Sequence, residues 1–426
     1  MVRTRRRAAA AVDPDRSRSV LIIIQNLPVP LDRRVWLECH TLRGSGYTVS
    51  VICPKGPGDP KRQTIDGVEV FKYRPYPPTQ RKLGFVAEYL YSFTMTAWLT
   101  ARARRVREFS VIQACNPPDI FWPIALASRA VAGTGFVYDQ HDLCPELFQS
   151  RFRDGLKPLY WGLRCLEWCT YKTADEVIST NDSYRAKAIG RGGKRPEHVT
   201  VVRTGPDPSR LRRQSPDPAL RRGRRFLACY LGVMGPQDGV DIVLRAAAFI
   251  VHDLGRDDIA FTLVGSGDCF QELVALRDEL GLQDYVEFTG RAPDALLFSV
   301  LSTADVGLSP DPKNPLNDVS TMNKTMEYMA FELPVVAFDL RETKVSAGDA
   351  GVYAEPNEVD LYAKAIVDLL DDEPRRAAMG ALGRKRVEET LAWAHQEGHY
   401  LDVYDRLTGR AAGGAPPATD GTAPPI

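Results

Sequence analysis

Polar side chains that could hold a phosphorylated ligand recur at helical spacing between residues 318 and 339. At about 100° per residue, one arc of this segment is polar. Its members are Ser320, Asn323, Lys324 and Glu327. Lys324 supplies a cation suited to phosphate, and Glu327 can accept from both hydroxyls of a diol such as ribose. This order of charges suits a nucleoside diphosphate, although a solvated helix face with a Lys324–Glu327 contact explains the same residues equally well.

The flanking residues predict where this helix begins and ends. Ser320 or Thr321 can cap the first turn, Pro334 ends the helix, and the apolar run 335–338 follows as a buried strand. The opposite arc is apolar and predicts packing against a core. It consists of Met322, Met326, Met329 and Ala330. Because helix N-termini attract anions, the polar cluster is expected on the turns that favour phosphate.

A histidine among carboxylates forms a second candidate group. His141 and Asp142 follow the apolar strand predicted at 136–138, and Glu146 comes shortly after them. Ligands of parallel sheets bind beyond the carboxyl ends of the strands, which favours a site role for the three residues. A loop histidine satisfied by its neighbours is the alternative.

A third group stands at the start of the chain's first βαβ pattern. The apolar runs 19–25 and 47–53 flank an amphipathic helix predicted at 31–42, which indicates a parallel sheet. Asp32, Arg33 and Arg34 lie at the carboxyl end of the first strand. They could touch substrate, or they could be a solvated helix start.

The second half of the chain repeats this pattern with glycine-rich turns. Gly232 and Gly235 follow the strand predicted at 226–231, and Gly265 and Gly267 follow the strand at 261–264. Glycines there allow close approach of the backbone to a ligand. Phe270 occupies the place of the third glycine of a dinucleotide fingerprint, which argues against a dehydrogenase.

Length and composition predict two globular domains and no nucleic-acid partner. The chain has 426 residues with 55 basic and 54 acidic side chains, so it lacks the basic excess of a nucleic-acid binder. Eight cysteines without a CxxC motif suggest free thiols in the cytoplasm. The predicted division is a disordered basic arm at 1–18, a first Rossmann-like domain at 19–205, a linker at 206–225, a second at 226–390, a C-terminal helix at 391–409 that could cross back to the first domain, and a disordered tail at 410–426.

The segment 82–107 predicts a long helix with an apolar, aromatic centre and basic ends. Glu88 and several hydroxyl residues interrupt it, so a membrane span is not expected. A packed surface helix is one interpretation. The other is a helix that touches an anionic membrane surface, which would place the protein peripherally at the inner face of the cell membrane.

Taken together, these motifs resemble the family 4 glycosyltransferases, whose architecture (GT-B) has two Rossmann-like domains with parallel sheets facing across a cleft. The resemblance covers about 20–407. It rests on NKTMEYMA (323–330) followed by LPVVA (333–337), on Gly265-x-Gly267 with FTG (288–290), and on the His141-Asp142 pair.

The resemblance implies a retaining transferase that moves a sugar from a nucleotide-diphospho-sugar to a glycan or lipid-linked acceptor without metal or cofactor. It assigns Glu327 to the ribose and His141 to the donor sugar, as the catalytic pair. The implied donor-binding set is Gly232, Gly235, Gly265, Gly267, Arg291, Ser320, Thr321, Asn323, Lys324 and Glu327. The acceptor side would comprise Asp32, Arg33, Arg34, Asp142 and Glu146. The only Asp-x-Asp, 13–15, lies in the predicted arm.

Two departures from the family pattern concern charge. The family's arginine and lysine near the first glycine turn fall on Val233 and Asp238, and the first of its two glutamates falls on Val319 beside Asp318. Diphosphate binding must then depend on Lys324, backbone amides and either Arg203 or Arg291. A nucleotide-sugar epimerase of the same architecture and a non-catalytic nucleotide-sugar binder in a glycan-assembly complex are the alternative functions.

Overall fold

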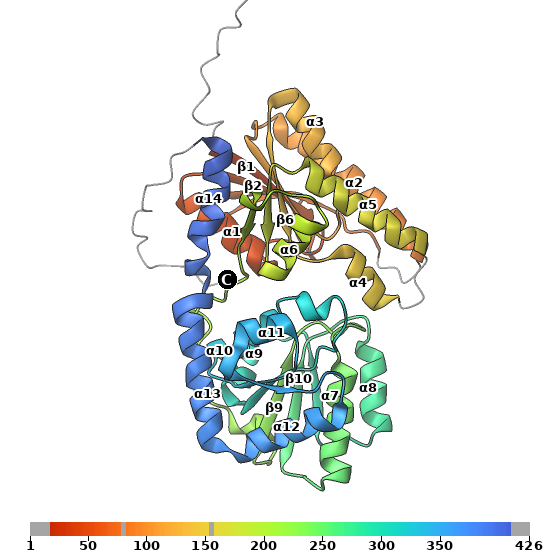
Figure 1. Cartoon of the computed structure of the whole chain (residues 1–426), viewed down its shortest axis with the longest axis vertical. Helices are drawn as coiled ribbons and strands as arrows, with labels where there is room; N and C mark the ends of the chain where they lie inside the picture. The colour runs from red at the N-terminus through yellow and green to blue at the C-terminus, as the bar shows by residue number, and fades with distance from the viewer. Residues whose placement is uncertain (1–17, 78–81, 153–156, 410–426) are drawn as a thin grey trace, which may run out of the picture.

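The computed structural model describes residues 18–77, 82–152 and 157–409. The arm predicted at 1–18, apart from Arg18, and the tail predicted at 410–426 lie outside these ranges. Two α/β domains stack along the long axis of the molecule (Figure 1). The predicted fold class is therefore confirmed.

The first domain is built on an eight-stranded sheet of order β3-β4-β2-β1-β5-β6-β7-β8. All pairs are parallel except β3 with β4. The strands are β1 (Ser19–Ile23), β2 (Thr48–Pro54), β3 (Arg62–Ile65), β4 (Val68–Tyr73), β5 (Val111–Cys115), β6 (Gly135–Gln140), β7 (Glu176–Ser179) and β8 (Val199–Val201). The helices are α1 (Arg33–Gly44), α2 (Lys82–Arg104), α3 (Trp122–Ala132), α4 (Cys144–Arg151), α5 (Lys157–Thr173) and α6 (Asp182–Gly190).

Alternation along β1 divides this domain's core into two layers. Val20 and Ile22 face α1, whereas Leu21 and Ile23 face the layer of α2, α3 and α5. Figure 1 shows α1 and α2 on opposite sides of the sheet. Burial on both faces explains why β1 is apolar after Ser19.

The second domain has a six-stranded, wholly parallel sheet of order β11-β10-β9-β12-β13-β14. Its strands are β9 (Phe226–Leu231), β10 (Ile259–Val264), β11 (Val286–Gly290), β12 (Val306–Ser309), β13 (Val335–Phe338) and β14 (Gly351–Ala354). Its helices are α7 (Val240–Ala248), α8 (Phe270–Glu279), α9 (Asp294–Thr303), α10 (Asn323–Ala330), α11 (Arg341–Ala347), α12 (Val359–Asp371) and α13 (Glu373–Arg386).

The chain crosses between the domains twice. It leaves the first domain after β8, and it returns after α13 so that α14 (Glu397–Thr408) lies beside α1 (Figure 1). The hydroxyl of Tyr400 donates to Gln113 Oε1 at 2.8 Å, and Trp393 Nε1 donates to Thr41 Oγ1 at 2.9 Å. The last helix thus completes the core of the first domain.

Direct contacts join the facing edges of the two domains. Leu143 and Tyr184 of the first domain pack with Leu316 and Val319 of the second. Asn181 Nδ2 donates to the Val319 carbonyl at 2.9 Å. The carboxyl ends of the two sheets therefore lie against each other, which is where ligands of such sheets bind.

The predicted start of the helix in 318–339 needs correction. Helix α10 begins at Asn323, and its N-cap Met322 makes no side-chain capping bond. Ser320 bonds the Tyr184 hydroxyl at 2.8 Å, and Thr321 Oγ1 accepts from Asn181 Nδ2 at 3.0 Å. Both hydroxyls serve the domain contact instead of capping the helix.

Candidate functional site

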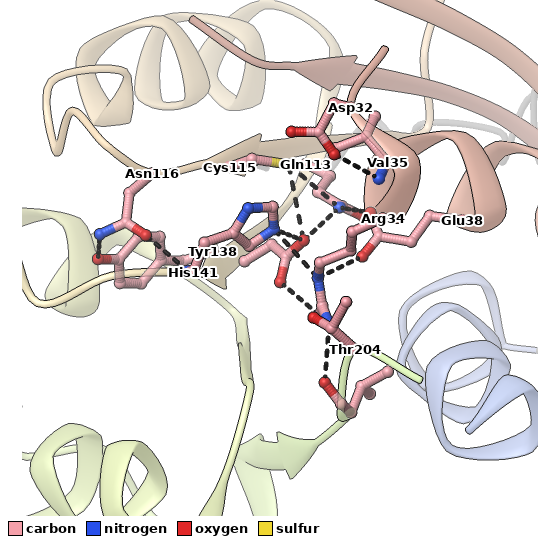
Figure 2. Close-up of polar contacts among 12 residues, drawn as sticks. Asp32, Arg34, Val35, Glu38, Gln113, Cys115, Asn116, Tyr138, His141 and Thr204 are labelled. Atoms are coloured by element: carbon pink, nitrogen blue, oxygen red, sulfur yellow. Dashed lines mark hydrogen bonds and ion pairs between the residues drawn. The ribbon is translucent and has the colours of Figure 1, made fainter. Parts of the chain in front are cut away.

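The carboxyl edge of the first sheet centres on Asp139, the penultimate residue of β6. Its side chain is fully buried and accepts from Gln113 Nε2 at 2.9 Å and from Arg34 Nη2 at 3.1 Å. His141 Nε2 lies 2.7 Å from Asp139 Oδ2. Figure 2 shows the side chains of Arg34, Gln113 and His141 converging from α1, from β5 and from the residue after β6.

This geometry fixes how His141 is presented. Nε2 lies 2.7 Å from Asp139 Oδ2 and 3.2 Å from Arg34 Nε. The shorter contact, to a carboxylate oxygen, favours a proton on Nε2 that is donated to Asp139. Asn116 Oδ1 accepts from the backbone N–H of His141 at 2.7 Å and from that of Asp142 at 3.1 Å. Within the described residues, Nδ1 of His141 has no hydrogen-bond partner. It is the ring atom left to accept from a ligand hydroxyl.

Arg34, predicted on the acceptor side, is buried at the carboxyl edge of the first sheet. Its side chain is 6% exposed and donates to the Val202 carbonyl and to Thr204 Oγ1 besides Asp139. Its Nε lies 3.0 Å from Glu38 Oε1. Burial, followed by the charge of Asp139, raises the pKa of Glu38 well above its ordinary value. The arginine is therefore balanced mainly by ionised Asp139.

Arg33, also predicted on the acceptor side, instead reaches the second domain. Its guanidinium donates to Glu327 Oε1 and to Asp294 Oδ1, both at 3.1 Å. Asp32 caps α1 by accepting from Val35 N–H at 3.0 Å. The ribose carboxylate expected at Glu327 is thus held by an arginine from the opposite domain. Burial raises the pKa of Glu327, an effect that Arg33 opposes.

Lys324 lies in the expected place, although it is not the solvated cation that its arc predicts. The side chain is 9% exposed, with Nζ 2.7 Å from Asp311 Oδ1 and 5.0 Å from the centre of the Tyr230 ring. Burial lowers its pKa, but Asp311 and other neighbours outweigh this and raise it. The ammonium group is therefore charged and fixed beside the first glycine turn.

The four predicted glycines position two backbone turns. A Cβ on Gly265 would lie 1.8 Å from the Gly232 carbonyl oxygen, and one on Gly267 would lie 2.6 Å from the Met234 carbonyl oxygen. Gly265 also has φ +144°, which favours glycine. Gly235 N–H donates to Asp238 Oδ2 at 2.8 Å. The close packing of one turn on the other explains why glycine stands at these positions. The amide of Gly235, which was expected to face phosphate, already donates to Asp238.

Asp238 gives the site a pH-dependent charge. Burial raises the pKa of its carboxyl to about 6, despite the opposing charge of Lys324. We expect Asp238→Asn to bind a nucleoside diphosphate about fivefold more tightly than the wild type at pH 7.5, because about 1 kcal/mol of repulsion is removed. Wild-type affinity should increase toward pH 5.5, and the variant's should not. Calorimetric titration at both pH values measures this difference.

The carboxyl of Asp238 should also make the folded state less stable as the pH rises. Its folded pKa exceeds the unfolded value of about 3.9, so its contribution is complete below pH 4 and is lost as pH rises through 6. Asp238→Asn should therefore gain stability relative to the wild type between pH 4 and pH 7.5. Asp241→Asn, at an exposed carboxylate on α7, is the control. A parallel response of the two variants would contradict the prediction.

The remaining predicted residues divide between the site and the scaffold. Arg291 and Asn323 are exposed at the edge of the second sheet. Burial raises the pKa of Asp142, next to His141. Glu146 is buried and paired with Arg191, which makes it a structural residue.

Sequence reasoning missed Arg151 at the end of α4. Its Nη1 lies 3.9 Å from Asp268 Oδ2, beside the second glycine turn, and its Nε is buried without a partner among the described residues. Its neighbours in sequence give no sign that it reaches the other domain.

Cys115, Asp139 and His141 place ligand-type atoms within 4.8 Å of one another. They do not fit a metal ion, because Arg34 brings a positive charge to the same carboxylate. Burial also raises the pKa of the Cys115 thiol well above its ordinary value, which disfavours the thiolate that a metal requires.

Two parallel-sheet domains with these residues at facing edges define the glycosyltransferase class with the GT-B fold. The fold matches the solved structure of sucrose-phosphate synthase from Thermosynechococcus elongatus with a TM-score of 0.73, at 16% identity, over 92% of this chain and 100% of the other. The model "Glycosyl transferase 4-like domain" matches residues 31–205, and "Glycosyl transferases group 1" matches residues 225–372. The chain belongs to this family of glycosyltransferases.

Curated relatives give narrower similarities. A D-inositol 3-phosphate glycosyltransferase from Thermomonospora curvata is 31% identical over 57% of this chain and 60% of the relative. A GDP-mannose-dependent alpha-(1-6)-phosphatidylinositol monomannoside mannosyltransferase from Mycobacterium tuberculosis is 31% identical over 51% of this chain and 58% of the relative. The chain thus matches about three-fifths of the length of these relatives.

Proposed function

We propose that this protein is a retaining glycosyltransferase that moves a sugar from a nucleotide-diphospho-sugar to a glycan or lipid-linked acceptor, without metal or cofactor. The observation that carries the proposal is that Arg33, from the sheet edge that presents His141, donates to Glu327 Oε1 of the second domain at 3.1 Å, so that the two candidate groups lie on facing edges. One of the two named relatives, the GDP-mannose-dependent phosphatidylinositol monomannoside mannosyltransferase, supports a lipid-linked acceptor.

Each group has a distinct part in this proposal. Glu327 would accept from the ribose hydroxyls, and Lys324 would neutralise charge on the diphosphate. Nδ1 of His141 would accept from a hydroxyl of the donor sugar, with Asp139 holding the ring in the required tautomer and stabilising any positive charge on it. Orientation and electrostatic stabilisation at the sugar–phosphate bond then supply the catalysis.

The test of this function is His141→Ala. We expect turnover to fall by about 10²-fold, because one oriented contact made to the reacting sugar is lost. Affinity for the bare nucleoside diphosphate should change less than about threefold, since that ligand has no sugar. Activity is measured with a panel of nucleotide sugars and acceptors, and affinity by titration.

His198→Ala is a matched control, because His198 pairs with Glu176 at the far side of the first domain. It should leave turnover unchanged. Full turnover in His141→Ala would show that His141 takes no part in the reaction. Donor conversion without acceptor would instead identify an epimerase.

We also propose that the first domain rests on an anionic membrane surface. Among the described residues, no helix is long and apolar enough to cross a membrane. The outer faces of α2 and α5 nevertheless expose large apolar side chains beside cations, as Arg102 lies over Trp98 and Lys172 over Trp168. The most exposed of these side chains are Val86, Leu90, Trp98, Trp161 and Trp168. Aromatic and basic groups in this arrangement suit the headgroup boundary.

Vesicle co-sedimentation tests this surface. The wild type should bind vesicles containing anionic lipid, and added salt should weaken binding. Trp161→Ser with Trp168→Ser should reduce the bound fraction several-fold, because two exposed indoles are lost. Leu361→Ser, at an exposed leucine on α12 of the other domain, should leave the bound fraction unchanged. A wild type that stays in the supernatant at low salt would contradict the proposal.

A further inference from the structure

A cavity of about 580 Å³ lies where the chain crosses between the domains. Its walls come from α6, the end of β8, the end of α13 and the start of α14, beside both crossings (Figure 1). Of the residues considered for the nucleotide sugar, only Arg203 lines it. We call it the hinge pocket.

Two hydrogen-bond donors in the hinge pocket lack partners. Arg203 is 13% exposed, and its Nη1 is buried without a partner among the described residues. Its nearest carboxylates, Glu342 and Asp182, are 3.7 and 4.0 Å from Nη2, too far for good hydrogen bonds. Gln396 is 8% exposed, and its Oε1 accepts from Arg203 N–H at 3.1 Å. In the described part of the chain its Nε2 has no partner.

Further cations line the same pocket. Arg185 donates to the carbonyls of Val199 and Pro196, and Arg386 donates to those of Ser346 and Val345. Among the residues that the structure describes, Nη1 of each guanidinium has no acceptor and can bind another one. His399 adds an exposed imidazole, which can donate in either charge state.

The charge of the lining is strongly one-sided. Three guanidinium groups face a single lining carboxylate, Asp182, whose side chain is 77% exposed at the rim. Unmet donors with excess positive charge are what a tetrahedral oxyanion satisfies. We propose that the hinge pocket is a binding site for the phosphate group of a small anionic ligand, separate from the nucleotide-sugar site.

The position of the pocket lets such a ligand contact both domains at once. Arg185 belongs to the first domain, Arg386 to the last helix of the second, and Arg203 to the crossing between them. An anion that contacts all three ties the domains together at the hinge. It also draws Arg203 away from Glu342 of α11.

Inorganic phosphate is the direct probe. At equal ionic strength, phosphate should raise the melting temperature of the wild type above its value in chloride, because a ligand that binds only the folded state stabilises it. Arg386→Gln with His399→Gln should weaken phosphate binding about tenfold or more, through the loss of charge-assisted contacts. Arg375→Gln, at an exposed arginine on the same α13, should retain wild-type binding.

GDP and UDP separate this pocket from the nucleotide-sugar site. The double variant should bind both as the wild type does. Absence of a phosphate effect in the wild type, an effect that the double variant retains, or an equal loss of nucleoside diphosphate affinity would each overturn the proposal. If the double variant fails to fold, Arg185→Gln tests the same pocket from the first domain.

Discussion

Replacement of Glu327 by alanine is expected to weaken nucleoside diphosphate binding about 30-fold or more. Two charge-assisted hydrogen bonds to a ribose contribute about 1.5 to 3 kcal/mol each, and release of the half-exposed Arg33 costs at most about 1 kcal/mol. The net loss is therefore at least about 2 kcal/mol. Titration with GDP and UDP measures it, and the melting temperature checks that the fold is intact.

Arg33→Ala is the matched control, since it removes the same ion pair from its other end. If Arg33 only occupies Glu327 in the absence of ligand, its loss leaves affinity unchanged or raises it up to about fivefold. Equal weakening by both variants would show that Glu327 acts through Arg33. Unchanged affinity in Glu327→Ala would end the ribose assignment.

Asp139→Ala is expected to produce the largest loss of stability, about 3 to 5 kcal/mol in the free energy of unfolding. The change leaves Arg34 charged and buried without its main counter-ion, and it removes an acceptor from Gln113 and His141. The lowered pKa of Asp139, due chiefly to Arg34 and His141 against the effect of burial, has the same origin. Urea denaturation of the wild type and the variant measures the difference.

Asp294→Ala is the control for a surface ion pair. Asp294 also binds arginines, but its side chain is 40% exposed, so its loss should cost no more than about 1 kcal/mol. Because the pKa of Asp139 is depressed, its contribution is present above the unfolded value near pH 4 and is lost on acidification below it. The Asp139→Ala deficit should hold through neutral pH. A deficit equal to that of Asp294→Ala would contradict the prediction.

The sequence predicts the fold well because buried parallel strands carry their own signal. The runs at 19–25, 226–231 and 335–338 are almost wholly apolar, and the strands β1, β9 and β13 lie within them. Strand β3 was not predicted, since it is an antiparallel edge strand whose residues Arg62–Ile65 are partly or fully exposed. Nothing in its composition distinguishes it from a polar loop.

The site was predictable only as far as local pattern reaches. Periodicity places Glu327 and Lys324 on one helix, but the partner of Lys324 is Asp311, beyond the end of β12. Arg33 and Glu327 are 294 positions apart, and only the folded arrangement joins them. Arg151 was not predicted because its partner, Asp268, also lies in the other domain. Charges whose partners come from another domain give no local periodic signal.

The return of α14 to the first domain affects the order in which the molecule can assemble during synthesis. Tyr400, Tyr404 and Val403 fill the core beneath α1, and Arg406 pairs with Glu176 of β7. These residues are translated after the whole second domain. Domains generally fold as they emerge from the ribosome, but here part of one apolar face of the first sheet, beside α1, stays uncovered until the second domain has been made. A ribosome stalled within the second domain therefore carries a first domain whose core is incomplete and exposed to chaperones.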